Sequence, residues 1–265
     1  MAAPHEEAAL ARVPDLPQWI DTRGMLLTGR ALVTFPPSQR FFSDGFVVEH
    51  PSRALLSAIG NPPGVIVAER ASAMQGDVNV LCGEDTAETV GNALPSWIRR
   101  GVRLFALPGV MPWELWQEDG DIAIFTRANA PSLAHLPESL RGEIADALEG
   151  HPSARFVPGK LPERLSADAS PTPVPVAAVF TDGQPVAFCY PVLQTETLWD
   201  VSVETLEAFR GRRFAARAAR AMVRYMRGSN KAPVWGSLET NAASLSVARQ
   251  LGFEEAGRLI VFART

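Results

Sequence analysis

The chain has 265 residues, of which 46% are hydrophobic and 20% are charged. This length and composition predict one large or two small domains with a sizeable core, and they exclude an intrinsically disordered chain. The net charge of -4 produces an overall field that attracts neither nucleic acid nor an anionic membrane. The two cysteines, Cys82 and Cys189, supply neither a disulfide framework nor metal-ligand spacing, so we expect no metal.

The N-terminus lacks the basic start and the apolar core of a secretory signal. No apolar run approaches the ~20 residues that a membrane-spanning helix needs. A reducing cytoplasm is the default compartment for such a chain. We therefore expect a cytoplasmic protein that makes no contact with a membrane.

The first part of the chain predicts a mixture of helices and strands. Helices are expected over residues 1–20, with prolines near the end, and over residues 86–100. Strands are expected over the β-branched runs 64–69, 77–82 and 102–107, which Gly, Pro or Asn residues bound. The order strand, helix, strand favours an α/β unit. We therefore assign residues 1–120 to an N-terminal α/β domain.

The remaining residues, 121–265, predict a second domain. Its expected strands are 121–127, 176–180, 185–190, 198–203, 234–238 and 258–263. Its expected helices are 138–148, 214–227 and 242–251, and the Pro-rich residues 151–175 are expected to form a loop. Asp182-Gly183 between two apolar runs predicts a β-hairpin, because a tight turn there needs residues with positive φ.

One turn in the second domain has the chemistry of a phosphate-binding site. The sequence Arg210-Gly211-Arg212-Arg213-Phe214-Ala215 opens an Ala/Arg-rich helix. A helix N-terminus offers backbone N–H groups and the positive end of the helix dipole to an anion, and small residues let a phosphate approach the backbone. Arginine side chains add charge-assisted hydrogen bonds. The alternative interpretation is an ordinary solvated basic helix start.

A second helix follows at a distance that suits the same ligand. Asn241 begins it, Ser244 lies one turn on, and it ends in Leu251-Gly252-Phe253. Asn241 is also a good N-cap, so its role is either the cap alone or the cap together with a ligand contact. Ser244 has the same two interpretations, a helix-surface hydroxyl or a ligand contact.

Together these motifs resemble the acyl-CoA-binding half of the GNAT superfamily of N-acetyltransferases. The superfamily's phosphate loop reads Arg/Gln-x-x-Gly-x-Gly/Ala; Arg210, Arg213 and Ala215 occupy the matching positions, and Arg213 stands where the superfamily has Gly. Trp235 and the helix that starts at Asn241 resemble a subgroup with a Trp strand and an Asn-x-x-Ser helix. The resemblance is good over residues 196–263, weaker over 121–195 and absent before that.

The resemblance implies a mixed, mostly antiparallel sheet flanked by helices, with acetyl-CoA as the acyl donor. The N-terminal α/β domain is then a lid or a degenerate companion domain that shapes the acceptor site. The resemblance assigns to the coenzyme the residues Val201, Ser202, Val203, Arg210, Gly211, Arg212, Arg213, Phe214, Ala215, Asn241 and Ser244. The first three belong to a strand that, in the superfamily, parts from its neighbour and pairs with the amide arm of coenzyme A.

Acyl transfer to an amine needs a base that removes a proton from the attacking nitrogen. Asp200 and Glu204 are the candidates, because residues four apart on a strand point to the same face; Glu239 is a third candidate. The superfamily's usual general acid is a Tyr seven residues after the Asn, and this chain has Ala248 there. The thiolate is then protonated by water, by Ser246 or by another residue.

Two further function classes stay open. The first is a catalytically degenerate acyl-CoA-binding or regulatory module, which the Arg at position 213 and the Ala at position 248 favour. The second is a nucleic-acid binder that uses a stripe of arginines on the helix expected at 214–227, at positions 217, 220, 224 and 227. The acidic net charge argues against this class, and we expect no nucleic-acid partner. The acceptor is either a small-molecule amine or a protein amine, and the protein either a monomer or a homodimer.

Overall fold

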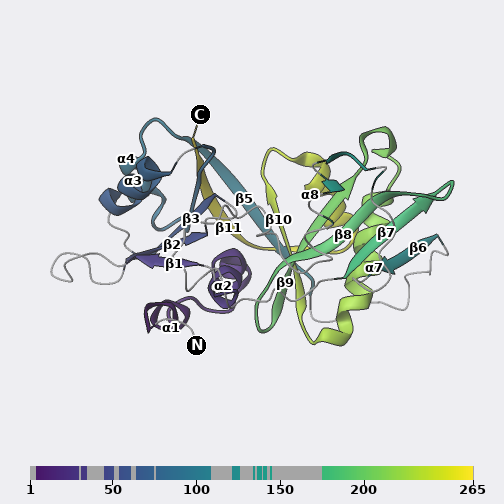
Figure 1. The fold of residues 1–265 in the computed structure, drawn as a ribbon, viewed down its shortest axis with the longest axis horizontal. Coiled ribbons are helices and arrows are strands. Elements are labelled where there is room, and N and C mark those ends of the chain that lie inside the picture. Colours follow the sequence, from purple (N-terminus) through teal and green to yellow (C-terminus); the bar gives the residue numbers. More distant parts are fainter. Residues whose placement is uncertain are drawn as a thin grey trace.

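The computed structural model describes residues 4–108 except 30, 35–44, 51–53, 61–63 and 75, then 121–125, 134, 136–138, 140–141 and 144, and finally 175–264. Within these residues, eleven strands form one mixed sheet in the order β1-β2-β3-β4-β11-β5-β10-β9-β8-β7-β6 (Figure 1). Only the pairs β3–β4 and β9–β10 are parallel, and all others are antiparallel. The predicted fold class, a mostly antiparallel sheet flanked by helices, is therefore confirmed.

The strands of the first half are β1 (Leu32–Thr34), β2 (Phe46–His50), β3 (Leu55–Ile59), β4 (Asn79–Cys82) and β5 (Ile98–Ala106). Those of the second half are β6 (Ile122–Phe125), β7 (Val176–Thr181), β8 (Gln184–Gln194), β9 (Leu198–Thr205), β10 (Ala232–Leu238) and β11 (Glu254–Ala263). The helices are α1 (Pro4–Leu10), α2 (Ile20–Leu27), α3 (Gly64–Ala73), α4 (Ala87–Ala93), α7 (Phe214–Met226) and α8 (Ala242–Gln250). Short 3-10 turns are η1 (Pro17–Trp19), η6 (Glu207–Phe209) and η7 (Arg227–Ser229).

The helices α3, α4, α7 and α8 cover one face of the sheet. Ile260 of β11 lies in the core beneath α3 and α4, and Phe105 of β5 lies in the core beneath α7 and α8. Ile260 pairs directly with Gly101, four residues before Phe105 on the same strand, so both cores lie on the same side. The opposite face carries α1 and α2, which pack on a separate core with Phe46 and Leu193.

The two halves of the chain repeat one order of elements. Each has three antiparallel strands, then helix, strand, helix and strand: β1-β2-β3-α3-β4-α4-β5 and β7-β8-β9-α7-β10-α8-β11. The last strand of each half is exchanged, because β5 pairs with β10 and β11 pairs with β4. The two exchanged strands also pair with each other, in the middle of the molecule (Figure 1).

Most predicted elements of the second half are confirmed, including the helices at 214–227 and 242–251. The hairpin turn is also confirmed, with φ of 52° at Asp182 and 76° at Gly183. The prediction of a strand at 64–69 is wrong, because these residues belong to helix α3. A continuous apolar run fits a buried helix as well as a buried strand, and periodicity does not separate the two.

The predicted helix at 86–100 is too long, since α4 ends at Ala93 and β5 begins at Ile98. Pro95 lies between them and favours an extended residue before it, which ends the helix. Of the predicted helix at 138–148, the described positions 138, 140, 141 and 144 are helical. The predicted loop at 151–175 lies outside the described residues, except for its last residue.

Candidate functional site

The turn before α7 is built from two residues with left-handed backbone. Gly211 has φ of 77°, and Arg213, the N-cap of α7, has φ of 64° and ψ of 12°. A Cβ on Gly211 would have no heavy atom within 4 Å, so this glycine serves the backbone conformation and not close packing. Together these residues turn the chain from η6 into α7.

The backbone N–H groups at this turn are available to a ligand. Among the described residues, none of the N–H groups of residues 211–216 donates to a backbone carbonyl, and the first bond of the helix runs from Arg217 N to Arg213 O at 3.2 Å. No side chain caps the helix. The α7 helix is 13 residues long, so the positive end of its dipole lies at the same turn. Arg210 to Arg213 are exposed to solvent.

The arginines of the turn carry their charge without an acidic partner in the described structure. Arg210 Nε lies 3.4 Å from the carbonyl oxygen of Thr205. The guanidinium of Arg212 stacks over the Phe209 ring, 5.6 Å from its centroid. No ion pair of Arg210, Arg212 or Arg213 with a described carboxylate is formed. The predicted loop residues therefore form an exposed, positively charged turn.

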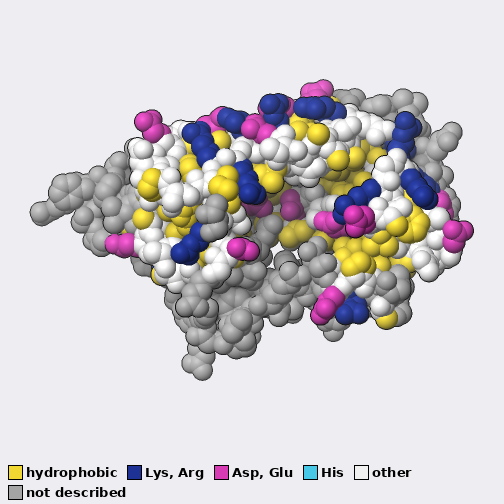
Figure 2. Space-filling model, turned by 90° about the horizontal axis from the view of Figure 1, so that it is seen from above, with side chains coloured by type: hydrophobic (Ala, Val, Ile, Leu, Met, Phe, Trp, Pro, Cys, Tyr) yellow, Lys and Arg dark blue, Asp and Glu magenta, His cyan; other side chains and the backbone are white. Residues whose placement is uncertain are grey.

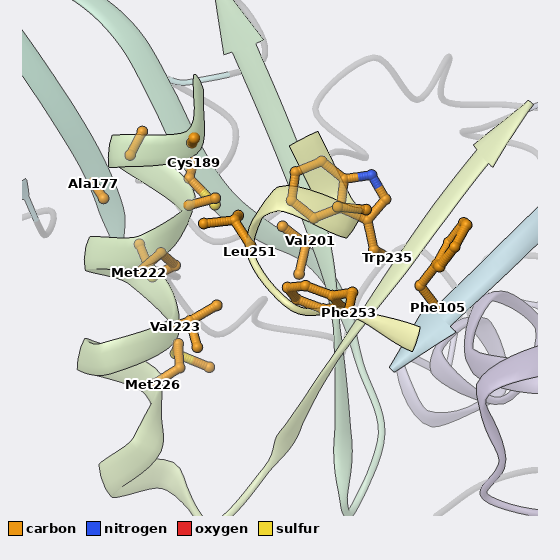
Figure 3. Close-up of a cluster of buried hydrophobic side chains, with 14 of the residues drawn as sticks. Phe105, Ala177, Cys189, Val201, Met222, Val223, Met226, Trp235, Leu251 and Phe253 are labelled. Atoms are coloured by element: carbon orange, nitrogen blue, oxygen red, sulfur yellow. The ribbon is translucent and has the colours of Figure 1, made fainter. Parts of the chain in front are cut away.

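The strands β9 and β10 separate next to this turn. They pair in parallel only from Leu198–Ala232 to Asp200–Val234. Beyond that point β10 pairs with β5, and β9 pairs with β8. In the part of the chain that the structure describes, the edge of Val201, Ser202 and Val203 that faces β10 has no strand partner. We call this edge the open seam; Figure 3 shows Val201 and Trp235 on its two sides.

The equivalent strands of the first half do not separate. Parallel pairing of β3 with β4 runs from Leu55–Asn79 to Ala58–Cys82, and Cys82 is the last residue of β4. The residues before α3 in the sequence include Pro62 and Pro63, which have no N–H to offer an anion. Within the described residues, the open seam is therefore a feature of the second repeat and not of the first.

Asn241 and Ser244 both make structural hydrogen bonds. The Asn241 side chain caps α8 by accepting from Ser244 N at 3.1 Å, which confirms the predicted cap. Ser244 Oγ accepts from the indole nitrogen of Trp235 at 2.9 Å, and Trp235 is only 3% exposed. Both side chains therefore have a structural role that needs no ligand, and their contact with a coenzyme stays a prediction.

Asp200, Ser202 and Glu204 share the face of β9 that points away from α7. Their neighbours Trp199, Val201 and Val203 pack in the core beneath α7, and alternate residues of a strand face opposite sides. Asp200 is the last residue of β9 that pairs with β10, so the open seam begins directly after it in the strand. The structure therefore brings both candidate bases to one face beside the open seam.

Glu239 is a poorer candidate for the base. Its carboxylate makes two hydrogen bonds with Arg258, at 2.8 and 3.0 Å, and lies 3.5 Å from Arg103. The hydrogen bonds from Arg258 hold the pKa of Glu239 below its ordinary value. Because two arginines bind this carboxylate, its ionised form is stabilised and it accepts a proton from an amine less readily. Ala248, which stands at the position of the superfamily's general acid, has no proton to donate and is fully buried in the core.

The Arg stripe of α7 is partly committed to contacts within the protein. Arg217 pairs with Asp121 of the segment before β6 and stacks over the Phe214 ring. On the face seen in Figure 2, Lys and Arg side chains lie dispersed among acidic ones and form no continuous basic surface. The described residues hold no cluster of three or more His, Cys, Asp and Glu side chains arranged for a metal ion, and none of their helices is long and apolar enough to cross a bilayer.

The sequence of the second half matches one known family. Residues 177–262 match the family model of GNAT acetyltransferases, and this range contains β8 to β10, α7, α8 and most of β7 and β11. The second half of the chain is therefore similar in sequence to the GNAT acetyltransferases. No curated protein sequence is similar enough to the chain to count as a match.

Solved structures of GNAT proteins share this fold over nearly their whole length. A GCN5-related N-acetyltransferase-like protein from Streptococcus suis has a TM-score of 0.66 at 12% identity, covering 98% of each chain. A GCN5-related N-acetyltransferase from Kribbella flavida has a TM-score of 0.55 at 14% identity, covering 93% of each chain. A tandem GNAT protein from the clavulanic acid biosynthesis pathway has a TM-score of 0.54 at 12% identity, covering 100% of this chain and 96% of the other.

Proposed function

We propose that this protein is an N-acyltransferase that moves an acyl group, acetyl by preference, from acyl-CoA to a primary amine. The observation that carries the proposal is the turn at residues 210–216, where unbonded N–H groups, three arginines and a helix dipole meet beside the open seam. A diphosphate needs such donors, and the extended arm attached to it needs a strand edge to pair with. Among the described residues, both are found together in the second repeat.

Each predicted residue has a role in this proposal. The N–H groups of residues 211–216 and the side chains of Arg210, Arg212 and Arg213 bind the pyrophosphate. The open seam at Val201, Ser202 and Val203 pairs with the amide groups of the pantetheine arm. Asn241 uses its side-chain oxygen in the cap, which leaves its NH2 group as a donor to the arm, and Ser244 accepts from Trp235, which leaves its own hydroxyl hydrogen.

The reaction is a direct transfer in a complex of both substrates. Bound acyl-CoA supplies the activated thioester. The carboxylate of Asp200 or Glu204 removes a proton from the attacking amine, because only the neutral amine is a nucleophile. Backbone N–H groups at the open seam polarise the thioester oxygen. With Ala248 in place of the usual Tyr, protonation of the leaving thiolate falls to water or to the exposed Ser246.

Repetition of the fold suggests a role for the first half. In this proposal residues 1–120 are the companion domain that shapes the acceptor side, while residues 121–265 provide the donor site. We expect the protein to act in the cytoplasm, as a monomer or homodimer, on a small-molecule or protein amine. Neither a metal nor a nucleic acid takes part.

A second candidate function is a catalytically degenerate acyl-CoA-binding or regulatory module. Arg213 at the position of a glycine and Ala248 at the position of the general acid favour it. The experiment that separates the two measures acetyl-CoA binding by titration calorimetry and thiol release with a panel of small amines and amine-bearing peptides. Amine-dependent thiol release supports the enzyme, tight binding without such release supports the module, and absence of acetyl-CoA binding overturns both.

A further inference from the structure

The polypeptide around η1 and α2, residues 15–27, holds the hairpin that joins β8 to β9. We call these residues the N-terminal clamp. Arg23 makes two hydrogen bonds to the Glu196 carboxylate, Nε to Oε2 at 2.8 Å and a guanidinium NH2 to Oε1 at 2.6 Å. Asp15 Oδ2 accepts from the Thr197 backbone N at 2.9 Å and from its hydroxyl at 2.7 Å. Residues more than 170 positions apart in the sequence are therefore fixed to one another.

The N-terminal clamp also packs against the hairpin with its apolar side. Ile20 forms a buried cluster with Leu198 and Val234, which lie at the two ends of the short parallel pairing of β9 with β10. Gly24 lies directly against β8: a Cβ at this position would come within 3.1 Å of Leu193 Cβ and 3.3 Å of the Gln194 carbonyl oxygen. The backbones of α2 and β8 are close because Gly24 has no side chain.

The segment of β8 beneath Gly24 is a β-bulge. Pro191 pairs with Val201 and Gln194 pairs with Trp199, so two residues of β8, Val192 and Leu193, lie opposite the single residue Asp200. A bulge re-aims the groups at its centre. Here the Leu193 backbone N–H donates to the Asp200 carboxylate.

The side chain and the backbone of Leu193 contact different parts of the protein. Its side chain is buried among residues of the first half, including Met25, Leu26 and Phe46. Its backbone N–H donates to the carboxylate of Asp200, the residue of β9 directly before the open seam. Leu193 therefore connects α2 to Asp200.

We propose that the N-terminal clamp positions Asp200 for acyl transfer, with Gly24 and Leu193 as the positioning residues. This inference rests on the proposed function and assigns the base role to Asp200 over Glu204. The first half then contributes to catalysis without touching either substrate, by fixing the β8 bulge that orients the carboxylate. Catalysis depends strongly on such orientation, because a reacting group displaced by about 1 Å can lower the rate ~100-fold.

The test compares two glycine variants in the full-length protein. Gly24→Ala pushes α2 away from the β8 bulge. Gly91→Ala is the matched control, since Gly91 also lies in a helix of the first half and its added Cβ would meet the Phe262 ring at 3.3 Å, far along the sheet from Asp200. We expect Gly24→Ala to lower kcat for acetyl transfer ~10- to 100-fold while the Kd for acetyl-CoA changes less than about twofold. Gly91→Ala keeps kcat near the wild-type value.

A double-mutant cycle decides whether the effect passes through Asp200. In an Asp200→Ala background, adding Gly24→Ala is expected to leave kcat unchanged, because the group that it displaces is already absent. Independent effects that multiply overturn the proposal, and so does a wild-type kcat in Gly24→Ala or in Asp200→Ala. If Gly24→Ala does not fold, Glu196→Gln loosens the N-terminal clamp at its exposed end; lower kcat at unchanged Kd supports the proposal, and unchanged kcat overturns it.

The proposed function fails in a different way. If the wild-type protein binds no acetyl-CoA, the acyltransferase assignment is refuted and the clamp's catalytic role with it. If the wild-type protein binds acetyl-CoA and transfers its acyl group while the double-mutant cycle shows no coupling, the acyltransferase assignment stands and only the clamp proposal is refuted.

Discussion

Arg213→Gly separates two effects of Arg213 at the proposed phosphate-binding turn, residues 210–216: the cost of its left-handed backbone and the charge of its side chain. Arg213 has φ of 64°, where a side chain with a Cβ costs about 1–2 kcal/mol relative to the right-handed region. Glycine removes this cost, but it also increases the conformational entropy of the unfolded chain, which lowers the free energy of unfolding by about 0.5–1 kcal/mol. We therefore expect the unliganded variant to be more stable by about 0.5–1 kcal/mol, which raises Tm by roughly 1–4 °C in a chain of this length.

The same substitution removes a guanidinium from the proposed pyrophosphate site. A charge-assisted bond to a solvent-exposed phosphate contributes about 1–2 kcal/mol, so the Kd for acetyl-CoA is expected to rise ~5- to 30-fold. Thermal unfolding without ligand and titration calorimetry with acetyl-CoA measure the two effects. A variant that is more stable and binds more weakly is unusual among point mutants, which makes the combined result specific.

The matched control for Arg213→Gly is Asn230→Gly. Asn230 follows η7, at the opposite end of α7, and is also left-handed, with φ of 60°. This variant relieves a similar backbone cost, a smaller one because Asn tolerates the conformation better, and is expected to leave the Kd for acetyl-CoA unchanged. An Arg213→Gly variant that keeps wild-type affinity refutes the role of Arg213 at the phosphate, and one that unfolds more easily refutes the strain argument.

Three further outcomes are expected. Arg210→Ala weakens acetyl-CoA binding by about 1–3 kcal/mol in titration calorimetry, because it removes a second guanidinium from the turn. Ser244→Ala destabilises the protein by about 1–3 kcal/mol in denaturant unfolding, because the buried Trp235 indole N–H loses its acceptor. Glu196→Gln is less stable than wild type at neutral pH, and the difference closes as the carboxylate is protonated in acid. Hydrogen bonds from Arg23 hold the Glu196 pKa below its ordinary 4.5, so the stabilisation is present above that value and is lost as pH falls through the lowered pKa.

Each of these outcomes has a result that contradicts it. Unchanged affinity in both Arg210→Ala and Arg213→Gly refutes the assignment of the turn to the pyrophosphate. A Ser244→Ala variant as stable as wild type shows that the Trp235 indole finds another acceptor, and Ser246→Ala on the exposed side of α8 is its control. A stability difference between Glu196→Gln and wild type that stays constant down to pH 3 shows that ionisation of Glu196 is not what holds the N-terminal clamp.

Local interactions let the sequence predict much of the second half. Asp182-Gly183 specifies its turn through positive φ, and Asn241 caps its helix through a bond that spans three residues. The alternation of residues along β9 places Asp200 and Glu204 on one face whatever else surrounds them. The turn before α7 is equally local, since its two left-handed residues lie within three positions of each other. The local pattern misled at residues 64–69, where a short apolar run is a helix because its buried residues pack on the sheet.

The tertiary structure alone decided how the two halves share one sheet and where the site lies in it. The local sequence does not specify that β5 pairs with β10, or β11 with β4, because strand pairing depends on long-range packing and hydrogen bonding. The same holds for the open seam, which exists because β10 leaves β9 to pair with a strand from the other half. The bulge at Leu193, whose N–H bonds to Asp200, packs against a helix more than 160 residues away in the sequence. The sequence therefore supplies the residue types, and the packing of the two halves brings them together.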